Sequence, residues 1–162
     1  MELIHVYMTQ NDIGGTLLTE IQIRNRPVVP YVRQTHRSRF SPRAKRYNDD
    51  QVGLKDILSL GMRDFKVEPY GKDCKLFVSV ECAMKPDKQK NSVKRIDIDN
   101  IYKAVSDAMN NVIYHDDRQI YHARIRKFKS DINNVYIKID NRYDVEPDNV
   151  ILENMSQSAI KY

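Results

Sequence analysis

The 162-residue sequence contains no tryptophan, only two cysteines, and only five glycines and six prolines. It has no apolar run near the roughly 18 residues that a membrane-spanning helix needs, so we expect no membrane association. The first residues, MELIHVYM, are too short and too acidic for a signal peptide. We therefore expect the cysteines to be free thiols in a cytoplasmic protein. Together these absences exclude secreted, membrane-spanning and fibrous proteins.

The composition is typical of a single globular domain. Hydrophobic residues make up 41% of the chain and charged residues 30%, which is too apolar for a disordered protein. Chains of this length usually build one hydrophobic core. No internal repeat or Pro/Gly/Ser-rich linker divides the sequence.

Acidic residues are missing from one long segment. Residues 24–46 contain eight Lys or Arg and no Asp or Glu, so this segment carries a net charge of +8. The rest of the chain carries −3, which gives the total of +5. Two further basic segments span residues 85–95 and 118–129, whereas residues 140–162 are acidic. Three basic segments on one face would form a surface for a polyanion, although any one of them alone is as often ordinary solvated surface.

Periodicity predicts strands and helices in alternation. Residues 16–24 alternate apolar and polar side chains and predict a strand, which leads into a long basic loop through Arg46. A helix should begin at residue 42 or 47 and end at Gly61. Further on, we expect a strand over residues 73–84 and a helix over residues 100–110. Two more strands, over residues 119–129 and 134–141, should follow.

This order indicates an α/β (α+β) fold, a single small domain in which a mixed, mostly antiparallel sheet packs against helices. We expect residues 1–15 to be an N-terminal extension, residues 16–142 to form the domain, and residues 143–162 to be an acidic C-terminal tail.

Carboxylates are concentrated in residues 94–119, KRIDIDNIYKAVSDAMNNVIYHDDRQ. If residues 96–99 end a strand, Asp97 and Asp99 project from the same face, because strand side chains alternate. Two such carboxylates repel each other unless a cation lies between them. Hard cations such as Mg²⁺ prefer oxygen ligands of this kind.

The helix that follows carries a polar stripe. Asn100 is expected to cap it, and Lys103 and Asp107 lie on the same side at helical spacing. Asp116 and Asp117 come after the helix and could return a third carboxylate to the first pair. Each feature alone has an ordinary explanation: a surface D-x-D, an Asp-rich turn, or an i,i+4 ion pair.

The combination resembles a known family. Its members, the RusA-like Holliday junction resolvases, carry the signature D-x-D-N-x-x-K…D…D-D-x-Q. This chain reads Asp97-Ile98-Asp99-Asn100, Lys103, Asp107 and Asp116-Asp117-x-Gln119. The spacing fits as well as the residue types, and the likeness covers about residues 16–141.

The resemblance implies a RusA-like fold and a metal-dependent endonuclease that acts as a homodimer on four-way DNA junctions, in recombination and repair. It implies that the catalytic residues are Asp97, Asp99, Lys103 and Asp117. Asn100, Asp107 and Asp116 would have supporting roles. The family occurs in bacteria and phages, so the chain would act in the cytoplasm of a bacterial cell or of a phage-infected host.

Phosphodiester hydrolysis is consistent with these residue types. It requires a neutralised phosphate, an activated water and a stabilised leaving oxygen, and carboxylate-bound Mg²⁺ can supply all three. We expect Asp97, Asp99 and Asp117 to hold Mg²⁺, or Mn²⁺ in its place. Lys103 would stabilise negative charge in the transition state or orient the water.

Cations around this site should bind branched DNA through its phosphates. Tyr31, Phe40 and Tyr47 lie in the basic segment, where they either stack on unpaired bases or pack beneath the loop. Two nicks of matching polarity suit a two-fold homodimer. The expected DNA-binding residues are Arg33, Arg37, Arg39, Arg43, Lys45, Arg46, Arg95, Arg124 and Arg126, with Lys127 and Lys129 on the same strand.

Three alternatives remain open from the sequence. The same metal site could serve a nuclease that prefers flaps or other branched DNA. The chain could instead be a non-catalytic nucleic-acid-binding module with structural acids. A metal phosphohydrolase of small substrates is disfavoured by the basic segments.

Overall fold

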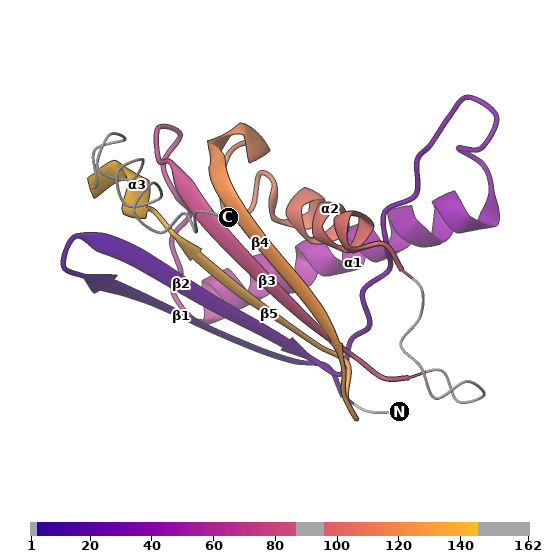
Figure 1. Ribbon diagram of the computed structural model, residues 1–162, viewed down its shortest axis with the longest axis horizontal. Coiled ribbons are helices and arrows are strands. Elements are labelled where there is room, and N and C mark those ends of the chain that lie inside the picture. The colour runs from indigo at the N-terminus through magenta and orange to yellow at the C-terminus, as the bar shows by residue number, and fades with distance from the viewer. Residues whose placement is uncertain (1–2, 87–95, 146–162) are drawn as a thin grey trace, which may run out of the picture.

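A computed structural model describes residues 3–86 and 96–145 of the chain. Its centre is a five-stranded sheet in the order β1-β2-β5-β3-β4, with α1 and α2 packed on one face (Figure 1). The strands are β1 (His5–Ile13), β2 (Thr16–Arg24), β3 (Leu76–Met84), β4 (Ile120–Lys129) and β5 (Asn134–Asp140). The helices are α1 (Pro42–Asp64), α2 (Ile98–Met109), the 3₁₀ turn η1 (Asp117–Gln119) and α3 (Arg142–Val145).

The pairing of the strands confirms the α+β prediction. β1–β2, β2–β5 and β3–β5 are antiparallel, and β3–β4 is parallel. The parallel pair is possible because α2 lies between β3 and β4 in the chain and supplies the crossover. The sheet is therefore mixed and mostly antiparallel, as expected.

Side-chain alternation builds the core on the helix-covered face. Met8, Ile21, Ile137 and Val80 stand in register across β1, β2, β5 and β3, and each is at most 2% exposed. The predicted apolar stripe of α2 lies against them, with every member buried: Ile101, Ala104, Val105, Ala108 and Met109. Both cysteines are free thiols, and Cys82 packs in the same core.

The predicted end of the first helix at Gly61 is wrong, because α1 continues to Asp64. Gly61 instead allows α1 to approach the sheet closely, since a Cβ at this position would lie 2.5 Å from Met8 Cε. The helix ends in a Schellman motif, in which Lys66 adopts a positive φ of 56° and the Val67 amide donates to the Met62 carbonyl at 2.8 Å.

The segment boundaries also differ from the predictions. The expected N-terminal extension, residues 1–15, contains β1, which pairs with β2 along its whole length. The basic loop ends at Ser41 rather than at Arg46, because the Ser41 Oγ accepts a hydrogen bond from the Ala44 amide and caps α1. Of the expected acidic tail, residues 143–145 lie in α3 and the others fall outside the described residues.

No helix within residues 3–86 and 96–145 is long and apolar enough to cross a membrane.

Candidate active site

The D-x-D motif lies at the start of a helix, so the prediction of a strand over residues 96–99 is wrong. Asp97 occupies the N-cap with φ −65° and ψ 137°, and α2 begins at Ile98, which is exposed rather than buried. Asn100 is therefore the third helical residue and not the cap. The alternation of Ile and Asp fits a strand locally, but the packing of Ile101 into the core selects the helix.

The two carboxylates of the motif remain available for a ligand. Asp97 and Asp99 are both exposed, and Asp97 makes no capping hydrogen bond. Within the described part of the chain, neither residue forms a side-chain hydrogen bond or an ion pair. The amides at the start of α2 favour negative charge here by about 0.3–1 kcal/mol per group.

Lys103 belongs to a network that links α2 to α1. Its Nζ lies 3.1 Å from Asp107 Oδ1, as the sequence suggested, and 5.0 Å from the centre of the Tyr31 ring. The Tyr47 hydroxyl donates to the other Asp107 oxygen at 2.9 Å. Burial, followed by this bond to Asp107, raises the pKa of Tyr47, so its hydroxyl remains a donor at neutral pH. Sixty residues separate Tyr47 from Asp107, so no local spacing in the sequence indicates this pair.

The first part of the basic segment is docked against the same helix. The Tyr31 amide donates to the Asn100 carbonyl at 3.0 Å, and its ring packs edge-on against Tyr47 at 5.5 Å. Tyr31 and Tyr47 thus pack beneath the loop, which is one of the two roles considered for them. Arg26 is also turned inward and pairs with Asp50 at 2.7 Å.

The second acidic pair divides into a carboxylate that caps a turn and an exposed carboxylate. Asp116 caps η1, because its side chain accepts from the Arg118 amide at 2.9 Å, and this bond lowers the pKa of Asp116. Gln119 completes the capping box: its Oε1 accepts from the His115 and Asp116 amides, at 2.8 and 3.1 Å. The spacing of Asp116 and Gln119 in the sequence, D-x-x-Q, is typical of such a capping box. Asp117 is left exposed beside it.

Gln119 also fixes where this turn lies. It is buried, and its Nε2 donates to the carbonyls of Gly71 and Cys74, at 2.7 and 3.1 Å. These bonds tie the acidic turn to the segment that leads into β3. The position of Asp117 therefore depends on the buried Gln119 side chain.

The charge of Asp117 acts on one residue of α2. Burial raises the pKa of Tyr102, and the negative charge of Asp117 raises it further. Tyr102 follows Asp99 by three positions on α2 and so shares its stripe. Across residues 3–86 and 96–145, however, no three His, Cys, Asp or Glu side chains are placed to hold a metal ion.

The expected DNA-binding residues of the basic segment are exposed. Arg33, Arg37 and Arg39 lie in the connection between β2 and α1, which extends beyond the sheet in Figure 1. Arg43, Lys45 and Arg46 lie on the first two turns of α1 and are exposed as well. Of these, Lys45 pairs with Asp49 at 2.6 Å. Arg95 falls outside the described residues.

The basic residues of β4 do not all share one face. Arg124 and Arg126 point to the open face of the sheet, and Arg126 pairs with Glu81 at 3.0 Å. Lys127 points to the opposite, helix-covered face, where its Nζ donates to the Ile96 carbonyl at 2.6 Å. Because strand side chains alternate, the idea of one convergent basic face does not hold for this strand.

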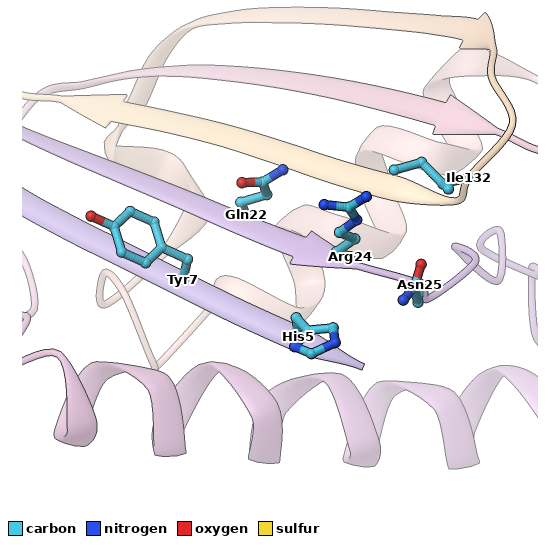
Figure 2. A pocket seen from close by; sticks show the side chains of 6 residues that line it. All are labelled: His5, Tyr7, Gln22, Arg24, Asn25 and Ile132. Carbon is cyan, nitrogen blue, oxygen red and sulfur yellow. The ribbon is translucent and has the colours of Figure 1, made fainter. Parts of the chain in front are cut away.

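The open face also carries a hollow at one end of β1 and β2. Figure 2 shows Gln22 and Arg24 projecting from β2 on the side of the sheet away from α1, near Tyr7 of β1. No carboxylate lines this hollow; its residues are His5, Tyr7, Gln22, Arg24, Asn25 and Ile132. It is therefore separate from the acidic residues of α2.

Comparison with known proteins gives one family match. The family model described as endodeoxyribonuclease RusA matches residues 26–140, which include the basic connection, α1, α2 and the acidic turn. A search of curated proteins found no match. Because the family model covers most of the chain and every motif discussed above, this protein belongs to the RusA family of endodeoxyribonucleases, which act on branched DNA.

Proposed function

We propose that this chain is a metal-dependent endodeoxyribonuclease that resolves four-way DNA junctions by paired phosphodiester hydrolysis, in recombination and repair. The observation that supports it most is the position of α2. Asn100 and Lys103, on the same helix as its two free carboxylates, contact Tyr31 of a basic segment without acidic residues. A phosphate bound by that segment would therefore lie close to the acidic residues.

The donor chemistry suits Mg²⁺ or Mn²⁺. Asp97 and Asp99 offer exposed carboxylate oxygens with no competing cation among the described residues. Among the described residues no three such side chains are grouped to hold a metal ion. Water and a DNA phosphate oxygen would therefore supply much of the coordination, and we propose that Asp117 joins Asp97 and Asp99 as a third ligand when DNA binds. When bound, the metal would activate water and neutralise the scissile phosphate.

The remaining residues would bind and orient the substrate. The Lys103 ammonium is about half exposed, and Asp107 and the Tyr31 ring hold it in place. From there it would approach a phosphate oxygen and stabilise charge in the transition state. The exposed arginines of the connection would bind neighbouring phosphates without reading sequence.

Two nicks of matching polarity require two sites related by a two-fold axis. We therefore propose that the chain acts as a homodimer, which places one site on each side of a two-fold junction.

A substrate panel tests this function. Labelled four-way junction, fork, flap and linear duplex would be incubated with Mg²⁺, with Mn²⁺, and with EDTA. We expect symmetric paired nicks in the junction that depend on the metal. Cleavage of flaps with an intact junction would identify a flap nuclease instead. Binding without cleavage under all metal conditions would identify a non-catalytic module.

A further inference from the structure

The Phe40 side chain is exposed to solvent at the end of the basic connection between β2 and α1. Its side chain is 81% exposed, more than any other large hydrophobic residue in the described ranges. Burying a Phe side chain usually stabilises a fold by about 1.5–3 kcal/mol, and this ring contributes none of it. Folding therefore does not account for an aromatic residue at this position.

Among residues 3–86 and 96–145, the ring packs against no buried apolar side chain. Because Ser41 is the N-cap of α1, Phe40 occupies the position before it, where an apolar residue usually packs against the fourth helical residue. That residue is Lys45, which is exposed and pairs with Asp49. Within the described part of the chain, the ring contact is with the guanidinium of Arg39, 4.7 Å from the ring centre.

The surroundings of the ring favour a nucleic acid as its partner. Arg33, Arg37 and Arg39 are exposed nearby, and residues 24–46 contain no acid that would repel phosphate. An unpaired base presents an apolar π-face flanked by phosphates, which matches an exposed ring flanked by arginines.

We propose that Phe40 stacks on an unpaired or unstacked base of branched DNA while the neighbouring arginines hold its phosphates. The proposal rests on the DNA-directed function above and adds the residue that contacts a base. Stacking is independent of sequence because every base has a π-face.

The absence of tryptophan provides a direct test. Phe40→Trp would contain a single tryptophan, whose fluorescence is quenched when it stacks on a base. Titration with a four-way junction in EDTA, which prevents cleavage, should quench this emission as the complex forms. Tyr7→Trp is the control, because Tyr7 is 57% exposed on the edge strand β1, and its emission should change little.

A second variant tests the contribution to affinity. Phe40→Leu keeps an apolar side chain but cannot stack, and we expect it to weaken junction binding by about tenfold. Tight junction binding by Phe40→Trp with unchanged tryptophan emission would overturn the stacking proposal and leave the nuclease function intact. Failure of the parent chain to bind any branched DNA would overturn both.

A different observation concerns Lys127, which faces the helices rather than the solvent. It stands in register with the buried Cys82 of β3, and its ammonium donates to the Ile96 carbonyl at 2.6 Å. Ile96 immediately precedes Asp97, the N-cap of α2. A charge-assisted bond of this kind is roughly twice as strong as a neutral one. It therefore ties β4 to the chain directly before the D-x-D motif.

We infer that Lys127 is a positioning residue that holds Asp97 and Asp99 in place, rather than a contact to phosphate. This inference also rests on the proposed nuclease function. If it is correct, removing the ammonium should reduce turnover by about 10- to 100-fold, the range seen for groups that orient metal ligands. The salt dependence of DNA binding should not change, because no phosphate contact is lost.

The test compares Lys127→Met with Arg124→Met, which removes one charge from the open face of the same strand. Lys127→Met should lower kcat with little change in KM, and Lys127→Arg, which retains a cationic donor, should recover most of the rate. In the free protein, Lys127→Met should also speed hydrogen exchange at the Ile101 amide, which donates to the Asp97 carbonyl. Arg124→Met should leave this exchange unchanged.

The exchange measurement does not depend on nuclease activity, so it separates this inference from the proposed function. Unchanged Ile101 exchange and turnover in Lys127→Met, with a salt slope lowered by about 0.9, would show that Lys127 contacts phosphate instead.

Discussion

Asp97→Asn is expected to lower metal-dependent junction cleavage by at least about 100-fold while junction binding stays as tight as in the parent chain. Loss of groups that merely orient metal ligands costs about 10- to 100-fold, so loss of a ligand should cost at least the upper value. Binding should be retained or strengthened, because removing a carboxylate reduces repulsion of phosphate.

The fold should tolerate this substitution. Asn is as good an N-cap as Asp, and the Asp97 side chain makes no capping hydrogen bond that could be lost. Asp99→Asn should behave in the same way, apart from a small loss of interaction with the helix amides. Cleavage and binding would be measured on the same labelled junction, in Mg²⁺ and in EDTA respectively.

Asp56→Asn is the matched control, because Asp56 is an exposed carboxylate on α1 that belongs to none of the motifs. It should cleave at the parental rate. Full metal-dependent cleavage by Asp97→Asn would contradict the assignment of this residue as a ligand. A parallel loss of binding and cleavage would instead indicate that Asp97 contributes to the DNA-binding surface.

The second large effect expected is a steep dependence of DNA binding on salt. If six cations contact phosphates, affinity for a four-way junction should fall by about 10³ between 50 and 200 mM salt, because each contact releases counterions. Replacing Arg33, Arg37 and Arg43 by Gln should lower the log–log slope by about 0.9 per contact, or about 2.7 in total. Fluorescence anisotropy over a salt series in EDTA gives both values.

A triple variant of equal charge provides the control. Lys55, Arg63 and Lys72 are exposed outside the basic connection, and their replacement by Gln should leave the slope unchanged. If the two triple variants lower the slope equally, DNA attraction comes from net charge alone. A slope that is flat in the parent chain would exclude phosphate contacts as the source of binding.

Several elements could be read directly from the sequence because their signals are local. A buried face recurs with period two in β2 and β5 and with a helical period in α2, and burial of these faces drives their packing. The i,i+4 spacing also predicted the Lys103–Asp107 pair, which forms within one helix. The motif spacing pointed to the family that the match over residues 26–140 supports.

Other features depend on contacts between distant segments. Ile-Asp-Ile-Asp is compatible with a strand or with a helix start, and only the burial of Ile101 against the sheet decides between them. The end of α1 was misplaced for a similar reason, since Gly61 serves the approach of β1 rather than the termination of the helix. Local propensity differs too little between such choices to outweigh tertiary packing.

The sequence by itself therefore determined which residues are candidates for the chemistry: the carboxylates of α2 and of the acidic turn, Lys103, and a basic segment free of acids. It also showed the absence of tryptophan, which makes a single-tryptophan reporter possible. The tertiary structure alone decided the partners of these residues. It paired Asp107 with Tyr47, placed Lys127 on the Ile96 carbonyl and Arg126 on the opposite face, and left Phe40 exposed. The physical reason is that residue type and spacing specify a side chain's chemistry and local face, whereas its partner depends on how separate elements bury their apolar surfaces together.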